Sequence, residues 1–158
     1  MTTFNDILDR TYTTLINDYR MDKLYLNDKE TFYTFLGGFL VNSIDMFSGC
    51  LGDLGYHSEE IEINEDETET IYVFDRELTS KEIRILCLGV AKELYKRDLD
   101  DASQYRLHLS TKDFKSFSEA QNLQRRTEIL IQKNEEFDRA ISDYQLDNFD
   151  KLPFFGGE

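Results

Sequence analysis

Residues 80–97 read SKEIRILCLGVAKELYKR, and this stretch decides the fold. Its apolar side chains recur at helical spacing on two neighbouring stripes rather than on one. The first stripe holds Ile83, Leu86, Cys87, Val90 and Leu94, and the second holds Ile85, Leu88 and Ala91. A helix that is apolar around most of its circumference has to be covered on several sides. We therefore expect residues 80–97 to form the central helix of a mainly α protein.

The residues before the central helix predict two more helices. Apolar side chains at three- and four-residue steps from Phe4 to Tyr19 predict a first helix that ends near residues 20–23. Asn27 followed by Glu30 is a capping-box pattern, which predicts the start of a second helix with a strongly aromatic stripe.

Two local signals refine these helices. Thr79 and Glu82 form another capping-box pattern, which places the start of the central helix. Gly37 and Gly38 lie inside the second helix, where each glycine costs up to about 1 kcal/mol relative to alanine. We expect this cost to be offset by a close helix crossing or to reflect a bend.

Between these helices, residues 48–78 change character. Glycines punctuate the start of the segment, and two β-branched or alternating runs flank a polar, acidic centre. This pattern predicts a β-hairpin or an extended loop. The spacing does not match an EF-hand, so a solvated acidic loop is the simplest interpretation of the carboxylates. They are Glu59, Glu60, Glu62, Glu65, Asp66, Glu67 and Glu69.

After the central helix, polar residues 98–104 predict a break, and a long final helix follows. Ser110 with Asp113 and Ser118 with Gln121 resemble helix N-terminal signals, so a short turn is expected before that helix. From Ala120 the helix carries a heptad-like seam that can pack within its own subunit or against a neighbouring copy. The seam consists of Leu123, Thr127, Leu130, Asn134, Phe137, Ile141 and Tyr144.

The chain ends in DNFDKLPFFGGE, residues 147–158, which place apolar side chains after the longest predicted helix. We therefore divide the sequence into a helical domain, residues 1–146, and an extended C-terminal arm, residues 147–158. The predicted fold is a small bundle of about four helices with a hairpin or loop insertion and this arm. The arm either docks on a partner or folds back over its own core.

Composition excludes several classes of function. The 18 Lys and Arg against 32 Asp and Glu give a net charge of −14, which opposes binding to nucleic-acid backbones and anionic membranes. Cys50 and Cys87 lie far apart in apolar surroundings, so we expect buried free thiols in a reducing compartment. We also expect neither a standard secretion signal nor a membrane span.

The sequence shows no motif of a catalytic, metal or cofactor site. His57 and His108 lack an acidic partner at a diagnostic spacing, and no nucleophile motif or phosphate-binding loop is present. We expect no enzymatic activity, no metal and no cofactor. Two binding hypotheses remain: assembly with copies of itself and a larger partner, or acidic mimicry of DNA. A DNA mimic does not need the sequence LPFFGGE, so the arm favours assembly.

Three segments also carry a family resemblance: FLVNSIDMFSGCLGDL (residues 39–54), RELTSKEIRILCLGVAKEL (76–94) and LSTKDFKSFSEAQNLQRRTEIL (109–130). They resemble the head–tail connector, or adaptor, proteins of long-tailed bacteriophages that infect Gram-positive hosts. The likeness covers roughly residues 30 to 146. The first shared pattern is matched by Leu78, Thr79, Glu82, Ile83, Ile85 and Leu86, and the more specific second one by Ser110–Lys115, Phe117, Ser118, Ala120 and Leu123.

The resemblance implies a structural virion protein that assembles in the host cytoplasm and resides in the neck of the virion. Such adaptors are helical bundles that form a ring, commonly of twelve copies, beneath the portal of the DNA-filled head. Stopper or tail-completion proteins lie below the ring, and DNA passes through without specific binding. The alternatives are another neck component, such as a stopper or tail-completion protein, or an acidic DNA-mimic inhibitor.

The resemblance also assigns expected roles to particular residues. The arm is expected to dock on the portal through Phe149, Leu152, Pro153, Phe154 and Phe155. Contacts between subunits are expected at Leu123, Arg125, Arg126, Leu130, Phe137 and Tyr144. The acidic residues between 59 and 69 are expected to line the channel or face the next ring, with a plain solvated loop as the alternative.

Overall fold

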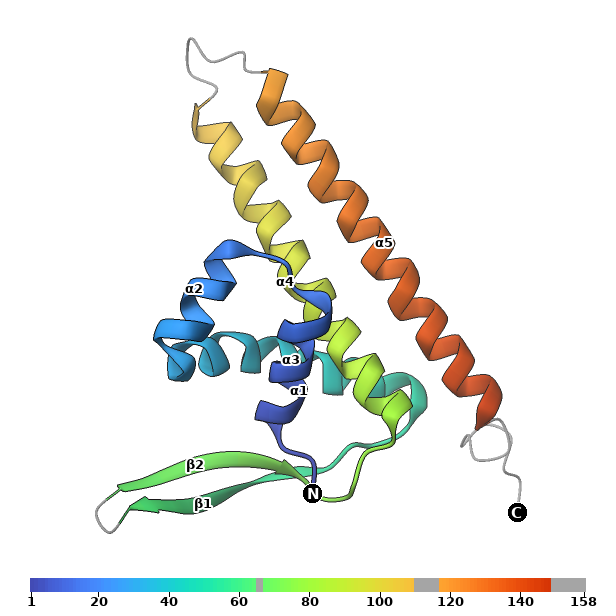
Figure 1. The fold of residues 1–158 in the computed structure, drawn as a ribbon. Coiled ribbons are helices and arrows are strands. Elements are labelled where there is room, and N and C mark those ends of the chain that lie inside the picture. The colour runs from blue at the N-terminus through green and yellow to red at the C-terminus, as the bar shows by residue number, and fades with distance from the viewer. Residues whose placement is uncertain (65–66, 110–116, 149–158) are drawn as a thin grey trace.

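The computed structural model describes residues 1–64, 67–109 and 117–148 (Figure 1). These residues form five helices and one antiparallel hairpin, so the predicted mainly α fold with a β insertion is confirmed. The elements are α1 (Phe4–Leu15), α2 (Tyr19–Asn27), α3 (Lys29–Leu51), β1 (Tyr56–Asn64), β2 (Glu67–Phe74), α4 (Ser80–Leu109) and α5 (Phe117–Asp147).

Helix α4 is the centre of the fold, as its sequence predicts. Every residue from Ile85 to Ala91 is buried, which leaves no solvent-facing side over two turns of helix. Helices α1, α3 and α5 all pack on α4, and each supplies apolar side chains to one continuous core. At roughly 25 cal/mol per Å² of apolar surface removed from water, this burial is the main source of stability.

The close helix crossing occurs in α4 and not at the paired glycines of α3. A Cβ atom on Gly89 would lie 2.6 Å from Oγ of Ser43 in α3 and 3.3 Å from a ring carbon of Phe137 in α5. Gly89 therefore lets three helices meet. The prediction of a close crossing at Gly37 and Gly38 is wrong, because a Cβ atom on either residue would meet nothing within 4 Å.

The N-terminal helix is shorter than the sequence periodicity predicts. It ends at Leu15, and Ile16 is extended with φ of −101° and ψ of 124°. Asp18 then caps α2 by accepting a hydrogen bond from the backbone N–H of Arg20 at 2.8 Å. The single helix predicted up to residues 20–23 is therefore two helices. Apolar spacing continues across the break and hides it.

Two other predicted boundaries also shift. Asp28, rather than Asn27, caps α3, because its carboxylate accepts from the N–H of Thr31 at 3.0 Å. Residues 98–104 do not break the chain but belong to α4, which runs for 30 residues. Their acidic side chains lie on a helix that packs antiparallel to α5, and the two helices extend together beyond α1–α3 (Figure 1).

The hairpin is held to the bundle at its base. Its strands pair from Tyr56↔Phe74 toward the tip, and Phe4 of α1 packs between Tyr56, Tyr72 and Phe74 with ring centroids 4.9–5.4 Å apart. Aromatic pairs at such distances contribute about 0.5–1.5 kcal/mol each beyond their buried area. From this base the two strands run away from α5 (Figure 1).

Replacing Gly38 by alanine is expected to stabilise the protein by about 0.5–1 kcal/mol, because alanine is the better helix former and the site is open. The matched change Gly89→Ala is expected to destabilise it by about 1–3 kcal/mol, since the methyl group meets Ser43 and Phe137. Urea unfolding followed by circular dichroism measures both. Equal effects of the two substitutions would contradict the placement of the crossing at Gly89.

Candidate functional site

A buried carboxylate lies where the hairpin, α4 and α5 meet. Glu82 is only 1% exposed, and it accepts hydrogen bonds from three other residues. Arg76, which follows β2, donates to its two oxygens at 2.6 and 3.0 Å. The backbone N–H of Thr79 donates at 2.7 Å, and the hydroxyl of Tyr144 in α5 donates at 2.8 Å. The capping box predicted from Thr79 and Glu82 is therefore formed, and its carboxylate does more than cap.

This environment keeps Glu82 ionised. Burial alone would raise the pKa of its carboxyl, but the hydrogen bonds from Arg76, Thr79 and Tyr144 outweigh burial and lower the pKa to about 2. Burial and the same carboxylate raise the pKa of Tyr144 to about 12. Because both carboxylate oxygens are occupied and the pKa is low, the geometry suits a structural ion cluster rather than a general base.

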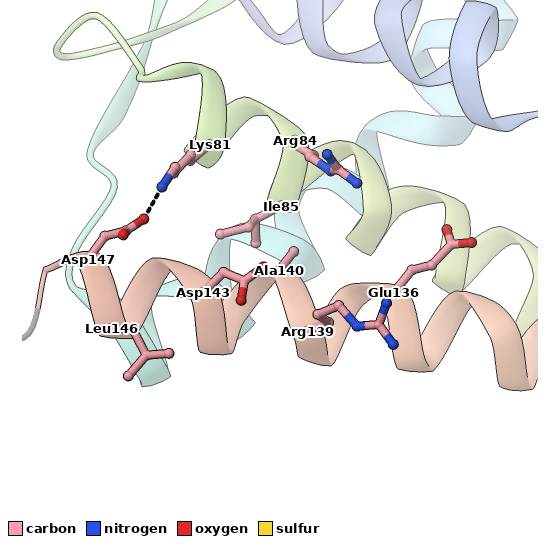
Figure 2. Close-up of a pocket in the computed structure, with 9 residues that line it drawn as sticks. All are labelled: Lys81, Arg84, Ile85, Glu136, Arg139, Ala140, Asp143, Leu146 and Asp147. Carbon is pink, nitrogen blue, oxygen red and sulfur yellow. Dashed lines mark hydrogen bonds and ion pairs between the residues drawn. The ribbon is translucent and has the colours of Figure 1, made fainter.

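Figure 2 shows a shallow groove beside this cluster, between the first turns of α4 and the last turns of α5. Its volume is about 390 Å³. Lys81 pairs with Asp147 across one end (Figure 2). The charged residues on the α4 side are basic, those on the α5 side are mostly acidic, and Ile85 and Ala140 lie between the helices (Figure 2). The lining residues are Lys81, Arg84, Ile85, Glu136, Arg139, Ala140, Asp143, Leu146 and Asp147. Such a mixed surface suits a polypeptide better than a small charged ligand.

A second ion cluster centres on Asp98 in α4, whose side chain is 18% exposed. Arg20 of α2 approaches its carboxylate to 2.5 Å, and Arg126 of α5 pairs with the same carboxylate. Arg126 also donates to the main-chain oxygen of Asp98 at 3.2 Å. Asp98 thus ties three helices together, and no sequence motif marks it.

The residues predicted at subunit contacts occupy different environments. Phe137 is 3% exposed in the chain's own core, and Tyr144 and Arg126 bond within the chain. Arg126 pairs with Asp98 of its own chain, and its side chain is 38% exposed. Leu123 and Leu130 are half-buried and Arg125 is exposed. These last three positions keep surface that a partner can reach.

The acidic residues of the hairpin divide between its two faces. By the strand register, Glu60 and Glu62 share a face with Tyr72, whereas Glu59 and Glu69 lie on the opposite face. Glu60, Glu62 and Glu69 are exposed. Glu65 and Asp66 lie outside the described residues, and Glu67 begins β2.

One acidic residue of the hairpin has a partner at the hairpin's base. Glu59 lies 3.1 Å from Nε2 of His57, whose Nδ1 lies 2.6 Å from Asp75. Hydrogen bonds to Asp75 and then to Glu59 raise the pKa of His57. The sequence does not predict this group of His57, Glu59 and Asp75, because Asp75 follows β2 and comes close to His57 only when the two strands pair.

The five residues expected to dock on a portal, Phe149, Leu152, Pro153, Phe154 and Phe155, lie outside the described part of the chain. The last described turn is fixed by two contacts. Asp147 pairs with Lys81, and the side chain of Asn148 donates to the carbonyl of Tyr144 at 3.0 Å. The Lys81–Asp147 pair thus holds the end of α5 against α4.

Comparisons with protein-family models, with curated proteins and with solved structures find no match for this chain. Within the described residues, no three or more His, Cys, Asp or Glu side chains gather in a way that could hold a metal ion. No helix in that part of the chain is long and apolar enough to cross a membrane. Cys87 is a buried free thiol, and burial raises its pKa.

Glu82→Gln is expected to destabilise the protein by about 2 kcal/mol at neutral pH, because Arg76 and Tyr144 lose an ionised acceptor. The folded-state pKa of Glu82 lies below its unfolded value, so its contribution is complete above about pH 4.5 and is lost as pH falls toward 2. Urea unfolding at several pH values should show the difference from the wild type narrowing in acid. The exposed Glu135→Gln is the control, and an equal loss there would contradict a special role for Glu82.

Proposed function

We propose that this chain is a structural head–tail adaptor, forming a ring beneath the portal of a long-tailed bacteriophage and joining the DNA-filled head to the tail. Its partners are the portal, a stopper or tail-completion protein and further copies of itself. It acts in the neck of the virion after assembly in the host cytoplasm. The proposal rests on the family resemblance of residues 30 to 146 together with the surface of α5.

The surface of α5 is the observation that carries the proposal. The helix has 31 residues, yet among those with described side chains, 121–147, Phe137 is the only buried one. Ile131 is 52% exposed, and Leu123 and Leu130 are half-buried. A helix this long with so few buried side chains gains stability from packing against a second surface. In a ring, a neighbouring copy of the same protein provides that surface.

The distribution of ion pairs agrees with a ring subunit that keeps its shape. Glu82 and Lys81–Asp147 link the start of α4 to the end of α5, and Arg126–Asp98 links the two helices again further along. Residues 126–147 of α5 are thus tied to α4 at two places, and we propose that this part of α5 acts as a rigid surface. Rigid surfaces lose less entropy when subunits associate.

The acidity of the hairpin supports passage of DNA rather than its capture. Exposed carboxylates on both faces of the strands repel phosphate groups from either side. In an adaptor ring this keeps a genome sliding during packaging and ejection. The same acidity would suit a DNA mimic, but such a protein does not need an apolar arm beyond Asp147.

The first test uses the portal ring of the same phage with the full-length chain, a truncation after Asn148 and the double variant Phe154→Ala, Phe155→Ala. Ending after Asn148 preserves the Lys81–Asp147 pair and the contact to Tyr144. We expect only the full-length chain to form a stoichiometric ring, measured by size-exclusion chromatography with mass determination. If no form binds but the full-length chain binds a tail-completion ring, the protein is a different neck component. If all forms bind equally, the arm is not the anchor.

Ile131→Asp is expected to prevent ring closure on the portal while leaving the fold intact, because a charge then replaces an exposed apolar contact. Leu26→Asp on α2 is the matched control, since Leu26 is 76% exposed and lies away from α5. Circular dichroism checks folding and mass measurement counts the bound copies. Full rings with Ile131→Asp would remove this part of α5 from the proposed interface.

A further inference from the structure

A second groove lies between the hairpin and helices α1 and α3, on the other side of the molecule's core from α5 (Figure 1). Its volume is about 870 Å³, more than twice the roughly 390 Å³ of the groove between α4 and α5. Five consecutive residues of β2, 68–72, line it, whereas Tyr56 is the lining residue from β1. Neighbouring residues of a strand point to opposite faces, so a groove lined by all five follows the edge of β2 rather than one flat face.

The outer edge of β2 already pairs with a short extended segment. Thr3 forms an antiparallel bridge with Val73, and the N–H of Phe74 donates to the carbonyl of Thr2 at 3.0 Å. Phe74 therefore directs its backbone groups outward, and alternation along the strand directs those of Tyr72 and Thr70 outward too.

The added segment is short because the chain turns into α1 at Phe4. The described sheet has two strands, so the edge of β2 beyond the Thr3 bridge is left without a partner strand in the described residues. An unpaired edge beside a groove is the arrangement to which an extended peptide adds as a further strand.

The residues that line the groove indicate which side chains that peptide would carry. Aromatic rings of Phe4, Tyr33, Tyr56 and Tyr72 line it together with aliphatic side chains from α1 and α3. The charged residues of the lining are Glu30 and Glu69, and the lining contains no Lys, Arg or His.

One further carboxylate, outside the lining, contacts a residue of the wall. The hydroxyl of Tyr33 donates to Asp9 at 2.8 Å, so that ring is fixed in place. Aromatic faces beside carboxylates attract guanidinium and ammonium groups through both cation–π and ionic interactions.

We propose that the edge of β2 and this groove bind an extended, basic segment of a partner protein, which continues the sheet as a third strand and places Arg or Lys side chains against the aromatic and acidic wall. The inference does not depend on the adaptor function and adds a partner surface separate from α5. Backbone pairing with β2 gives the affinity, and Glu30 and Glu69 give the preference for positive charge.

A second copy of this chain is the less suitable occupant. Pairing two hairpins edge to edge would bring the acidic strands of both copies together, and like charges on adjacent strands are destabilising. A nucleic acid is disfavoured for the same reason, because its phosphates would meet Glu30 and Glu69.

The test uses three blocked synthetic peptides of equal length and the full-length protein. The first alternates valine with arginine, the second replaces arginine by glutamate, and the third replaces one central valine by proline, which removes a backbone donor. Fluorescence anisotropy measures binding, and NMR shifts of the β2 amides locate it. We expect the arginine peptide to bind at β2 and the other two to bind at least about tenfold more weakly.

Charge reversal tests the wall. The exposed pair Glu30→Lys, Glu69→Lys is expected to weaken binding of the arginine peptide by at least about tenfold, whereas the control Glu128→Lys, Glu135→Lys on α5 adds the same charge elsewhere and retains binding. Equal loss in both double variants would show a net-charge effect and overturn the proposal. So would tight binding of the glutamate or proline peptide, or concentration-dependent self-association that the arginine peptide does not displace.

Discussion

Complete burial of α4 between Ile85 and Ala91 is the constraint on which the rest of the structure depends. A helix without an exposed side over two turns has to be covered by α1, α3 and α5 together, which fixes where each of them lies. Gly89 makes this packing possible, because the absence of a side chain there lets Ser43 of α3 and Phe137 of α5 both approach α4 at this residue. The two proposed partner surfaces lie outside this arrangement, on the edge of the hairpin and on the outer side of α5.

Glu82 connects these outer parts. Its carboxylate accepts hydrogen bonds from Arg76, at the end of the hairpin, and from Tyr144, in the last turn of α5. These bonds fix the end of the hairpin relative to the end of α5. An ion cluster of this kind adds little net stability over a well-packed apolar one, although removing one partner is destabilising. Its value here lies in orientation. Moving the end of the hairpin relative to the last turn of α5 would separate Arg76 or Tyr144 from this carboxylate.

The sequence predicts the central helix, the hairpin and the final helix because each follows from a local pattern: two apolar stripes, a β-branched pair of runs and a heptad-like seam. The sequence does not reveal the helix end at Ile16, because apolar residues continue at helical spacing through it. The caps at Asp18 and Asp28 are also hard to predict, because neighbouring residues are equally good N-cap residues. The sequence predicts a break at residues 98–104 because the partners of Asp98, which are Arg20 and Arg126, come from distant parts of the chain. The same limit applies to the sites. Capping chemistry predicts contact between Thr79 and Glu82, but nothing local predicts Tyr144 or the aromatic wall around Tyr33.

The positions of the carboxylates are more informative about function than the net charge of −14. Asp9, Asp22, Glu82 and Asp98 accept hydrogen bonds from Tyr33, Tyr12, Tyr144 and the arginines, so part of the acidity is used to hold the fold together. The exposed remainder on the hairpin is divided between two faces by the strand register. In the adaptor role proposed above, carboxylates on both faces of the strand pair would keep DNA away from either side, and the edge of β2 would stay accessible to a basic partner.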